Sequence, residues 1–178
     1  TSGTVNADGQ KTTIKKKTIS TETVDENTAL AKNGGTLKIT NSTLNKAGND
    51  TDGDNCNFYG INSIVLVMNA ASKAYISNTE LNATGEGSNG IFATDGAAVY
   101  ANEDTINTTS DNSRGLDATY SGTIIANEMR ISTQGDHSAA LATDRGGGNI
   151  SVTNSTLSTT GSGSPLLYST GDIEVDNV

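Results

Sequence analysis

Hydrophobic residues return about every 25 positions along most of the chain, and this repeat constrains the fold more than any other feature. Aliphatic and alanine residues form three columns at this spacing. The first contains Ile14, Ile39, Ile76, Ala101, Ala126 and Val152, the second Ile19, Leu44, Leu81, Ile106, Ile131 and Leu157, and the third Ile91, Leu116, Leu141 and Leu166. Self-similarity at a fixed period is typical of a solenoid, in which each repeat covers the core of the next.

Composition favours the same architecture. Only 33% of the residues are hydrophobic and 4% are aromatic, with no Trp. This is too little bulky material for a conventional globular core, whereas a solenoid coil needs only a few inward aliphatic side chains. Thr favours strands, and Asn and Gly favour corners with positive φ. No segment shows a sustained period of 3.6 residues, so we expect almost no helix.

Residues 98–122 illustrate one coil. Three short alternating segments place Val99, Ile106 and Leu116 inward, and polar corners separate them. Stacked coils of this kind bond through their backbones at a spacing of about 4.8 Å, and a slip by one residue would turn the core outward. The sequence therefore predicts an all-β, right-handed parallel β-helix of roughly seven coils, with three strands per coil and a single domain over residues 1–178.

The repeat is interrupted once, because Leu44 and Leu81 lie 37 positions apart. We interpret the extra residues as an inserted acidic loop over 45–59 and a second, apolar insertion containing Ile64 to Met68. Solenoid insertions emerge on one face, which often binds ligands. The chain has no signal peptide or initiator Met and stops within a further coil, so we expect it to be a fragment of a longer protein.

Two groups of acidic residues are candidates for Ca²⁺. Asp50, Asp52 and Asp54 alternate around Gly53, as oxygen ligands do in a calcium loop. Stacking also brings together Glu86, Asp111 and Asp136, whose like charges repel unless water or a cation screens them. An ordinary acidic turn in the first case and a solvated ladder of turns in the second are the alternatives.

A candidate ligand site combines tyrosine, arginine and carboxylate side chains at one corner of the predicted coils. A tyrosine ring stacks on a sugar, and charged groups bind its hydroxyls. Asp117 interrupts an apolar column, so it either faces a shallow groove or pairs with Arg114 or Arg145. The alternative is a structural ion pair beside a surface tyrosine. The predicted ligand-binding residues are Asp95, Asp117, Tyr120, Asp144 and Arg145.

No catalytic residues are predicted. Glu103 stacks on Glu128 in a column with Asn78 and Asn154, which favours a structural asparagine-type ladder over an acid/base pair. Cys56 has no cysteine partner, and His137 lies several predicted coils from it, so neither indicates a hydrolytic triad.

Charge limits the partners of this chain. The net charge is −9 and the isoelectric point about 4.4, which argues against nucleic acid. No apolar run is long enough to insert into a membrane. The basic start of the chain, with Lys15, Lys16 and Lys17, contrasts with its acidic remainder. End-to-end self-association through unpaired strand edges is therefore another candidate interaction.

Four segments of the repeat, Ser88–Gly96, Ser113–Gly122, Ser138–Gly148 and Gly163–Gly171, resemble repeats of adhesin-like right-handed parallel β-helix surface proteins of anaerobic, gut-type bacteria. This resemblance implies secretion to the bacterial cell surface, adhesion or glycan binding, and a host or plant glycan or surface protein as partner. We therefore expect a non-catalytic adhesin or glycan-binding module. A calcium-dependent polysaccharide lyase-like enzyme and a self-assembling extracellular fibre subunit are the alternatives.

Overall fold

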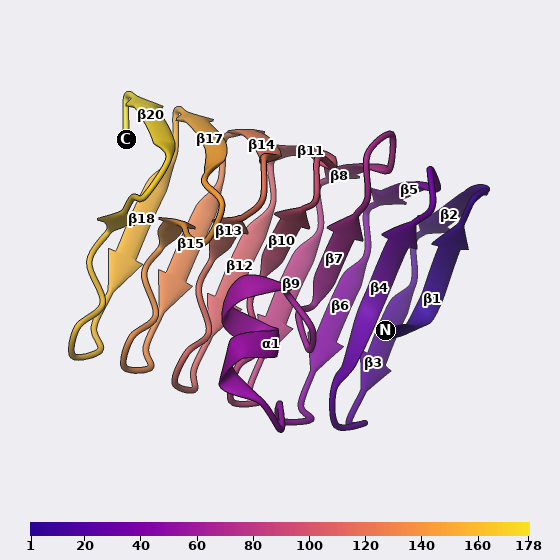
Figure 1. The fold of residues 1–178 in the computed structure, drawn as a ribbon, viewed down its shortest axis with the longest axis horizontal. Coiled ribbons are helices and arrows are strands. Elements are labelled where there is room, and N and C mark those ends of the chain that lie inside the picture. The colour runs from indigo at the N-terminus through magenta and orange to yellow at the C-terminus, as the bar shows by residue number, and fades with distance from the viewer.

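A computed structural model describes residues 1–178 as a solenoid of three parallel sheets (Figure 1). Sheet A contains β1 (Ser2–Asp8), β4 (Glu26–Lys32), β7 (Val65–Met68), β10 (Ile91–Thr94), β13 (Leu116–Ala118), β16 (Leu141–Thr143) and β19 (Leu167–Tyr168). Sheet B contains β2 (Lys11–Lys15), β5 (Thr36–Thr40), β8 (Lys73–Ser77), β11 (Ala98–Asn102), β14 (Gly122–Asn127), β17 (Gly148–Thr153) and β20 (Asp172–Asp176). Sheet C contains β3 (Thr18–Thr21), β6 (Thr43–Lys46), β9 (Glu80–Ala83), β12 (Thr105–Thr108), β15 (Arg130–Thr133) and β18 (Thr156–Thr159).

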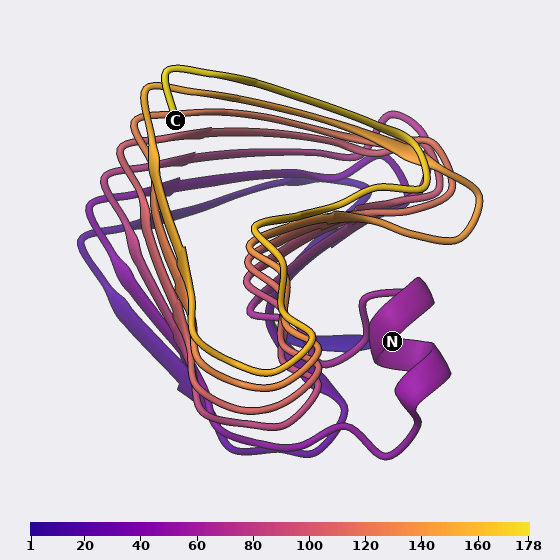
Figure 2. The same ribbon diagram turned by 90° about the vertical axis from the view of Figure 1, so that its left-hand side faces the viewer.

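The coils are wound with a right hand, as the sequence predicts. Figure 2 views the solenoid from its C-terminal end, and the chain turns counterclockwise as it approaches the viewer. Sheet B lies along the top of this view, sheet C along the left, and sheet A forms an indented third side.

Strand register confirms the first two hydrophobic columns in full. Ile14 pairs with Ile39, and the same column continues through Ile76 to Val152. Ile19 heads the second column, which ends at Leu157. Inward residues of all three sheets form one core along the rod. Because each inward side chain stacks on its equivalent, the repeat in the sequence is a direct record of this packing.

The third column is correct except at its last member. Leu141 pairs with Leu167 instead of Leu166. The reason is one extra residue at the corner that contains Gly146 and Gly147. Leu116 and Leu141 are 25 positions apart, whereas Gly122 and Gly148, on the far side of this corner, are 26 apart.

Corners with positive φ separate the sheets. At the corner between sheets B and C, Asn41, Asn78, Glu103, Glu128 and Asn154 all have φ between 47° and 56°. Asn adopts this conformation more readily than most residues, which explains why it recurs at this position. Glu103 and Glu128 therefore occupy adjacent copies of one structural corner.

The interruption of the repeat adds 12 residues, and all but one of them form an insertion between β6 and β7; the remaining one lies between β7 and β8, where Met68 and Lys73 are five positions apart and the equivalent Thr94 and Ala98 four. Thr43 and Val65 are 22 positions apart, whereas the equivalent Glu80 and Ile91 are 11 apart, so 11 residues are added between β6 and β7. They include the helix α1 (Gly53–Phe58). The apolar run Ile64 to Met68 is not a second insertion, as the sequence suggested, because Val65–Met68 form β7 in the middle of sheet A.

Candidate functional site: the covered face of sheet A

The insertion lies against the indented outer face of sheet A, with α1 outside the coil (Figure 2). Hydrogen bonds from two side chains of the coils fix it there, and a third, buried bond joins the two ends of the segment. Asn89 Nδ2 donates to the carbonyl of Cys56 (2.9 Å), Thr119 Oγ1 donates to that of Phe58 (2.7 Å), and Asn62 Nδ2 donates to that of Gly48 (2.9 Å). Asp52 caps α1 by accepting from the Asp54 amide. These contacts tie a segment of irregular backbone to side chains of the regular coils.

A small second core forms between the insertion and the sheet. Leu30, Leu66 and Phe92 belong to an outward-facing column of sheet A, yet all three are fully buried. Gly60 fits against them only because it lacks a side chain. A Cβ there would lie 2.5 Å from the Phe92 ring, and the φ of +73° also favours glycine. The insertion thus covers apolar surface that would otherwise face water.

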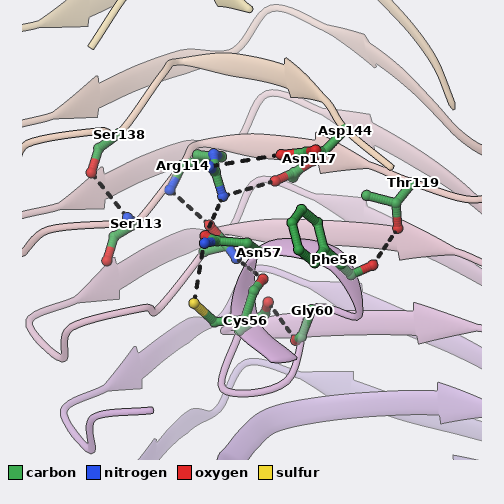
Figure 3. Close-up of polar contacts among 12 residues, drawn as sticks. Cys56, Asn57, Phe58, Gly60, Ser113, Arg114, Asp117, Thr119, Ser138 and Asp144 are labelled. Atoms are coloured by element: carbon green, nitrogen blue, oxygen red, sulfur yellow. Dashed lines mark hydrogen bonds and ion pairs between the residues drawn. The ribbon is translucent and has the colours of Figure 1, made fainter. Parts of the chain in front are cut away.

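The next residue of this column is Asp117, which has a cation beside it. Its side chain is fully buried, and Arg114 Nη1 lies 3.6 Å from Oδ2 (Figure 3). Arg114 also donates to Asn57 Oδ1 in α1 (2.6 Å) and lies 3.9 Å from Asp144. Burial raises the pKa of Asp117 well above its usual range, while the nearby guanidinium opposes this shift. Arg114 therefore joins the insertion to two carboxyl groups of the coils.

A groove opens beside this covered region. Its volume is about 400 Å³, and we call it the tyrosine groove. The rings of Tyr59, from the insertion, and Tyr120, from the coil, are almost parallel, with centroids 5.8 Å apart. Interaction with the Tyr59 hydroxyl raises the pKa of Tyr120 above its usual value of 10. The groove is lined by Tyr59, Met68, Thr94, Asp95 and Tyr120.

Arg145 lies next to the groove but faces Phe58. Its guanidinium carbon is 3.8 Å from the centroid of the Phe58 ring, an attractive cation–π geometry. Phe58, Asp144 and Arg145 line a shallower neighbouring depression. The arginine thus holds the end of α1 against the corner that contains Gly146 and Gly147.

The structure brings together part of the predicted ligand site. Asp95 and Tyr120 share the tyrosine groove, and Asp144 and Arg145 line the depression beside it. Asp117 is different, because a ligand cannot reach a fully buried carboxyl under Arg114 and α1. Its partner is Arg114, one of the two arginines that the sequence suggested.

Four of the six acidic residues considered for Ca²⁺ have other neighbours, and Glu86 and Asp54 are exposed. Asp111 Oδ1 accepts from the amide of Asp136, and Asp136 Oδ1 accepts from that of Ser162, so these carboxylates bond the next coil. Asp50 lies against Gly87 and Asp52 caps α1, while Asp54 is exposed in its first turn. No three Asp, Glu, His or Cys side chains converge in a metal-binding arrangement. Calcium binding stays a prediction that titration would test.

A second groove runs along the corner between sheets B and C, past Glu103, Glu128 and Arg130. Asp104 lies at this groove and is 1% exposed, and its Oδ2 has no hydrogen-bond partner. Equivalent corners carry Ser42 and Ser155, whose hydroxyls accept an amide from one coil and donate to a carbonyl two residues back. The Asp104 carboxylate accepts the amide of Thr79 in the same way, but it has no proton to donate to a carbonyl. Burial raises the pKa of Asp104 to about 8.

Comparison of the chain with protein-family models, with curated proteins and with solved structures found no match. No helix has the length and apolar character needed to cross a membrane. The molecule is therefore defined by its fold: a right-handed parallel β-solenoid with one helical insertion covering sheet A.

The half of the site that the insertion supplies is not predicted by the repeat. Tyr59, Phe58 and Asn57 lie at non-repeating positions, so no column predicts their neighbours. A usable signal was present in Leu66 and Phe92, which add apolar residues to an outward column. Such a column requires a cover, and the insertion is the one segment long enough to provide it.

Proposed function

We propose that this solenoid is a non-catalytic carbohydrate-binding surface module, and that the tyrosine groove holds the sugar. The observation that carries the proposal is the stacked pair of Tyr59 and Tyr120, which lines an open groove together with Asp95. Tyrosine rings offer apolar faces and edges for the CH groups of a sugar, and their hydroxyls bond its polar groups. The groove volume lies within the range that is typical of small-molecule sites.

The lining residues favour neutral or amino sugars over uronic acids. Asp95 is the one charged residue that lines the groove, and its carboxylate accepts a hydrogen bond from Asn69 (3.1 Å). Its remaining lone pairs are suited to sugar hydroxyls or to an ammonium group. A second carboxylate from a uronic acid would meet like charge there, since Arg145 is engaged with Phe58.

Adhesion at a bacterial surface, which the resemblance of the repeats implies, is compatible with such a module. A rigid rod that presents one shallow site is suited to binding glycans without chemically changing them. A lyase needs acidic groups and a basic group facing one substrate. Of Asp117, Asp144 and Arg145, the combination in this region with that chemistry, Asp117 is enclosed. The groove therefore supports binding better than it supports bond cleavage.

Binding to an array of neutral, amino and uronic oligosaccharides tests the proposal, followed by calorimetry with the best ligand. Tyr59→Ala and Tyr120→Ala are each expected to weaken binding at least about tenfold, equivalent to about 1.4 kcal/mol. Tyr75→Ala is the matched control, because Tyr75 is 44% exposed, as Tyr59 is, and stacks on Tyr100 in the same way. Equal losses from Tyr75→Ala and Tyr59→Ala, or no binding to any sugar at millimolar concentration, would contradict the proposal.

A further inference from the structure

The outward face of sheet B carries an apolar stripe that nothing covers. The stripe consists of Tyr75, Tyr100 and Ile125 on three consecutive strands, with exposed fractions of 44%, 39% and 48%. The two rings stack with centroids 5.2 Å apart, and a groove of about 330 Å³ runs beside them. The outward face of sheet C, by contrast, bears no large exposed hydrophobic residue. Contiguous exposed apolar surface of this kind marks an interaction site.

Opposite charges lie at the two ends of the same face. On β2, the first strand of sheet B, Lys11 and Lys15 point outward and are exposed. On β20, the last strand, Asp172, Glu174 and Asp176 point outward and are exposed. The register of the seven strands aligns Lys11 with Asp172 and Lys15 with Asp176, in the two columns that flank the stripe.

The centre of this pattern is Tyr100. Its strand, β11, is the fourth of the seven strands in sheet B, with β2 and β20 at equal distances from it. A two-fold axis along β11, in the plane of contact, would place β2 of one copy on β20 of another. Lys11 then faces Asp172, Lys15 faces Asp176, Tyr75 faces Ile125, and Tyr100 faces its own equivalent. The face is thus complementary to itself, as a two-fold interface requires.

We propose that two copies of this chain associate side by side through the outward faces of sheet B. The stripe forms the centre of the interface, and the charges on β2 and β20 form its rim. Lys38 and Lys73, which lie next to the stripe, face the uncharged Ser151 and Thr123 of the other copy. The partner is a second copy because the two charged ends match each other in both sign and spacing. This pairing is independent of the sugar site, which uses residues of sheet A and the insertion.

Size predicts a weak association. Seven strands spaced about 4.8 Å apart, each contributing five residues of about 3.3 Å, give a face of roughly 500 Å² per copy. The total of about 1,000 Å² lies at the low end of specific interfaces. We therefore expect a dimer that forms reversibly as concentration rises and that salt weakens, because the rim charges are screened.

Sedimentation equilibrium of the full chain over a concentration series tests the proposal. The expected result is a monomer–dimer equilibrium whose dissociation constant increases with NaCl concentration. Tyr100→Glu places two carboxylates against each other at the two-fold axis and is expected to raise the dissociation constant at least tenfold. Ser158→Glu, an exposed position on sheet C, is the matched control and is expected to leave it unchanged. Circular dichroism confirms that both variants fold.

Charge reversal separates this dimer from end-to-end stacking. Asp172→Lys with Asp176→Lys is expected to abolish the dimer, and adding Lys11→Asp with Lys15→Asp is expected to restore it. End-to-end stacking would yield open polymers that Tyr100→Glu leaves intact, and that result would overturn the proposal. A monomer at millimolar concentration and low salt would overturn it as well. Tyr59→Ala, expected to weaken sugar binding, is expected to dimerise normally, so the two proposals fail or succeed separately.

Discussion

The outer faces of sheets A and B are built from the same repeat, but the insertion covers the first and the second is exposed to solvent. Both carry a stacked tyrosine pair, Tyr59 with Tyr120 near sheet A and Tyr75 with Tyr100 on sheet B. On sheet A the insertion supplies one ring and buries the surrounding surface, whereas both rings on sheet B come from the coils and remain exposed. The comparison shows that a non-periodic segment turns part of a periodic face into a groove, whereas the uncovered face of sheet B stays an open surface.

Removing the Phe92 ring, which the insertion covers, is expected to have the largest effect on stability. Phe92→Ala deletes a fully buried side chain beneath the insertion and is expected to cost about 3–5 kcal/mol. Tyr100→Ala removes an exposed ring from sheet B and is expected to cost less than about 1 kcal/mol. Urea denaturation at micromolar protein concentration measures both. Similar losses in the two variants would show that the insertion does not bury Phe92 in solution.

Separating the buried ion pair is expected to be nearly as damaging. Arg114→Met leaves Asp117 buried without a cation and is expected to cost about 3 kcal/mol. The double variant Arg114→Met with Asp117→Leu removes both charged groups and is expected to recover most of that loss. If the double variant is no more stable than the single one, Arg114 acts through Asn57 or Asp144 instead.

Substitutions at two glycines distinguish the cost of a packing clash under the insertion from the cost of backbone strain. Gly60 and Gly34 both have positive φ, +73° and +79°, but a Cβ on Gly34 would meet nothing within 4 Å. Gly34→Ala is expected to cost about 1 kcal/mol from its conformation alone. Gly60→Ala adds a clash with Phe92, and we expect about 2 kcal/mol beyond that value. Thermal unfolding of the two variants gives the difference, and equal melting temperatures would exclude the clash.

Two buried carboxyl groups extend the comparison to pH. Asp117 forms an ion pair with Arg114, whereas Asp104 lies at a regular corner and has no cation bonded to it. The pKa of Asp104 is raised from 3.8 to about 8, so between these two pH values the folded protein keeps a proton that the unfolded chain releases. Its contribution to stability is therefore complete below about pH 4 and is lost as pH rises toward 8.

Asp104→Ser reproduces the hydroxyl found at Ser42 and Ser155 and is expected to remove this pH dependence. At pH 8 the variant is expected to exceed the parent chain in stability by at least about 1 kcal/mol. Melting temperatures from pH 4 to pH 8 measure the trend. Parallel curves for the variant and the parent would mean that Asp104 is ionised throughout this range.

The fold was predictable because its determinants repeat. Ile14, Ile19 and their equivalents recur at a period that only stacked coils satisfy, and the register confirms both columns. Leu166 was misplaced because the extra residue in the glycine corner precedes two adjacent leucines, and the sequence does not distinguish which of them faces inward. The candidate site was only half predictable. Asp95 and Tyr120 lie in columns, whereas Tyr59 and Asn57 gain their neighbours from the tertiary path of a unique segment.

The position of the insertion has a consequence for engineering. β6 pairs with β9 in the same register as every other pair in sheet C, although 37 positions separate them instead of 25. Length added at the corner between sheets C and A is thus absorbed without disturbing the strands on either side. This corner is a natural graft point, where foreign loops with an apolar underside can be exchanged for the native one and displayed on a rigid scaffold.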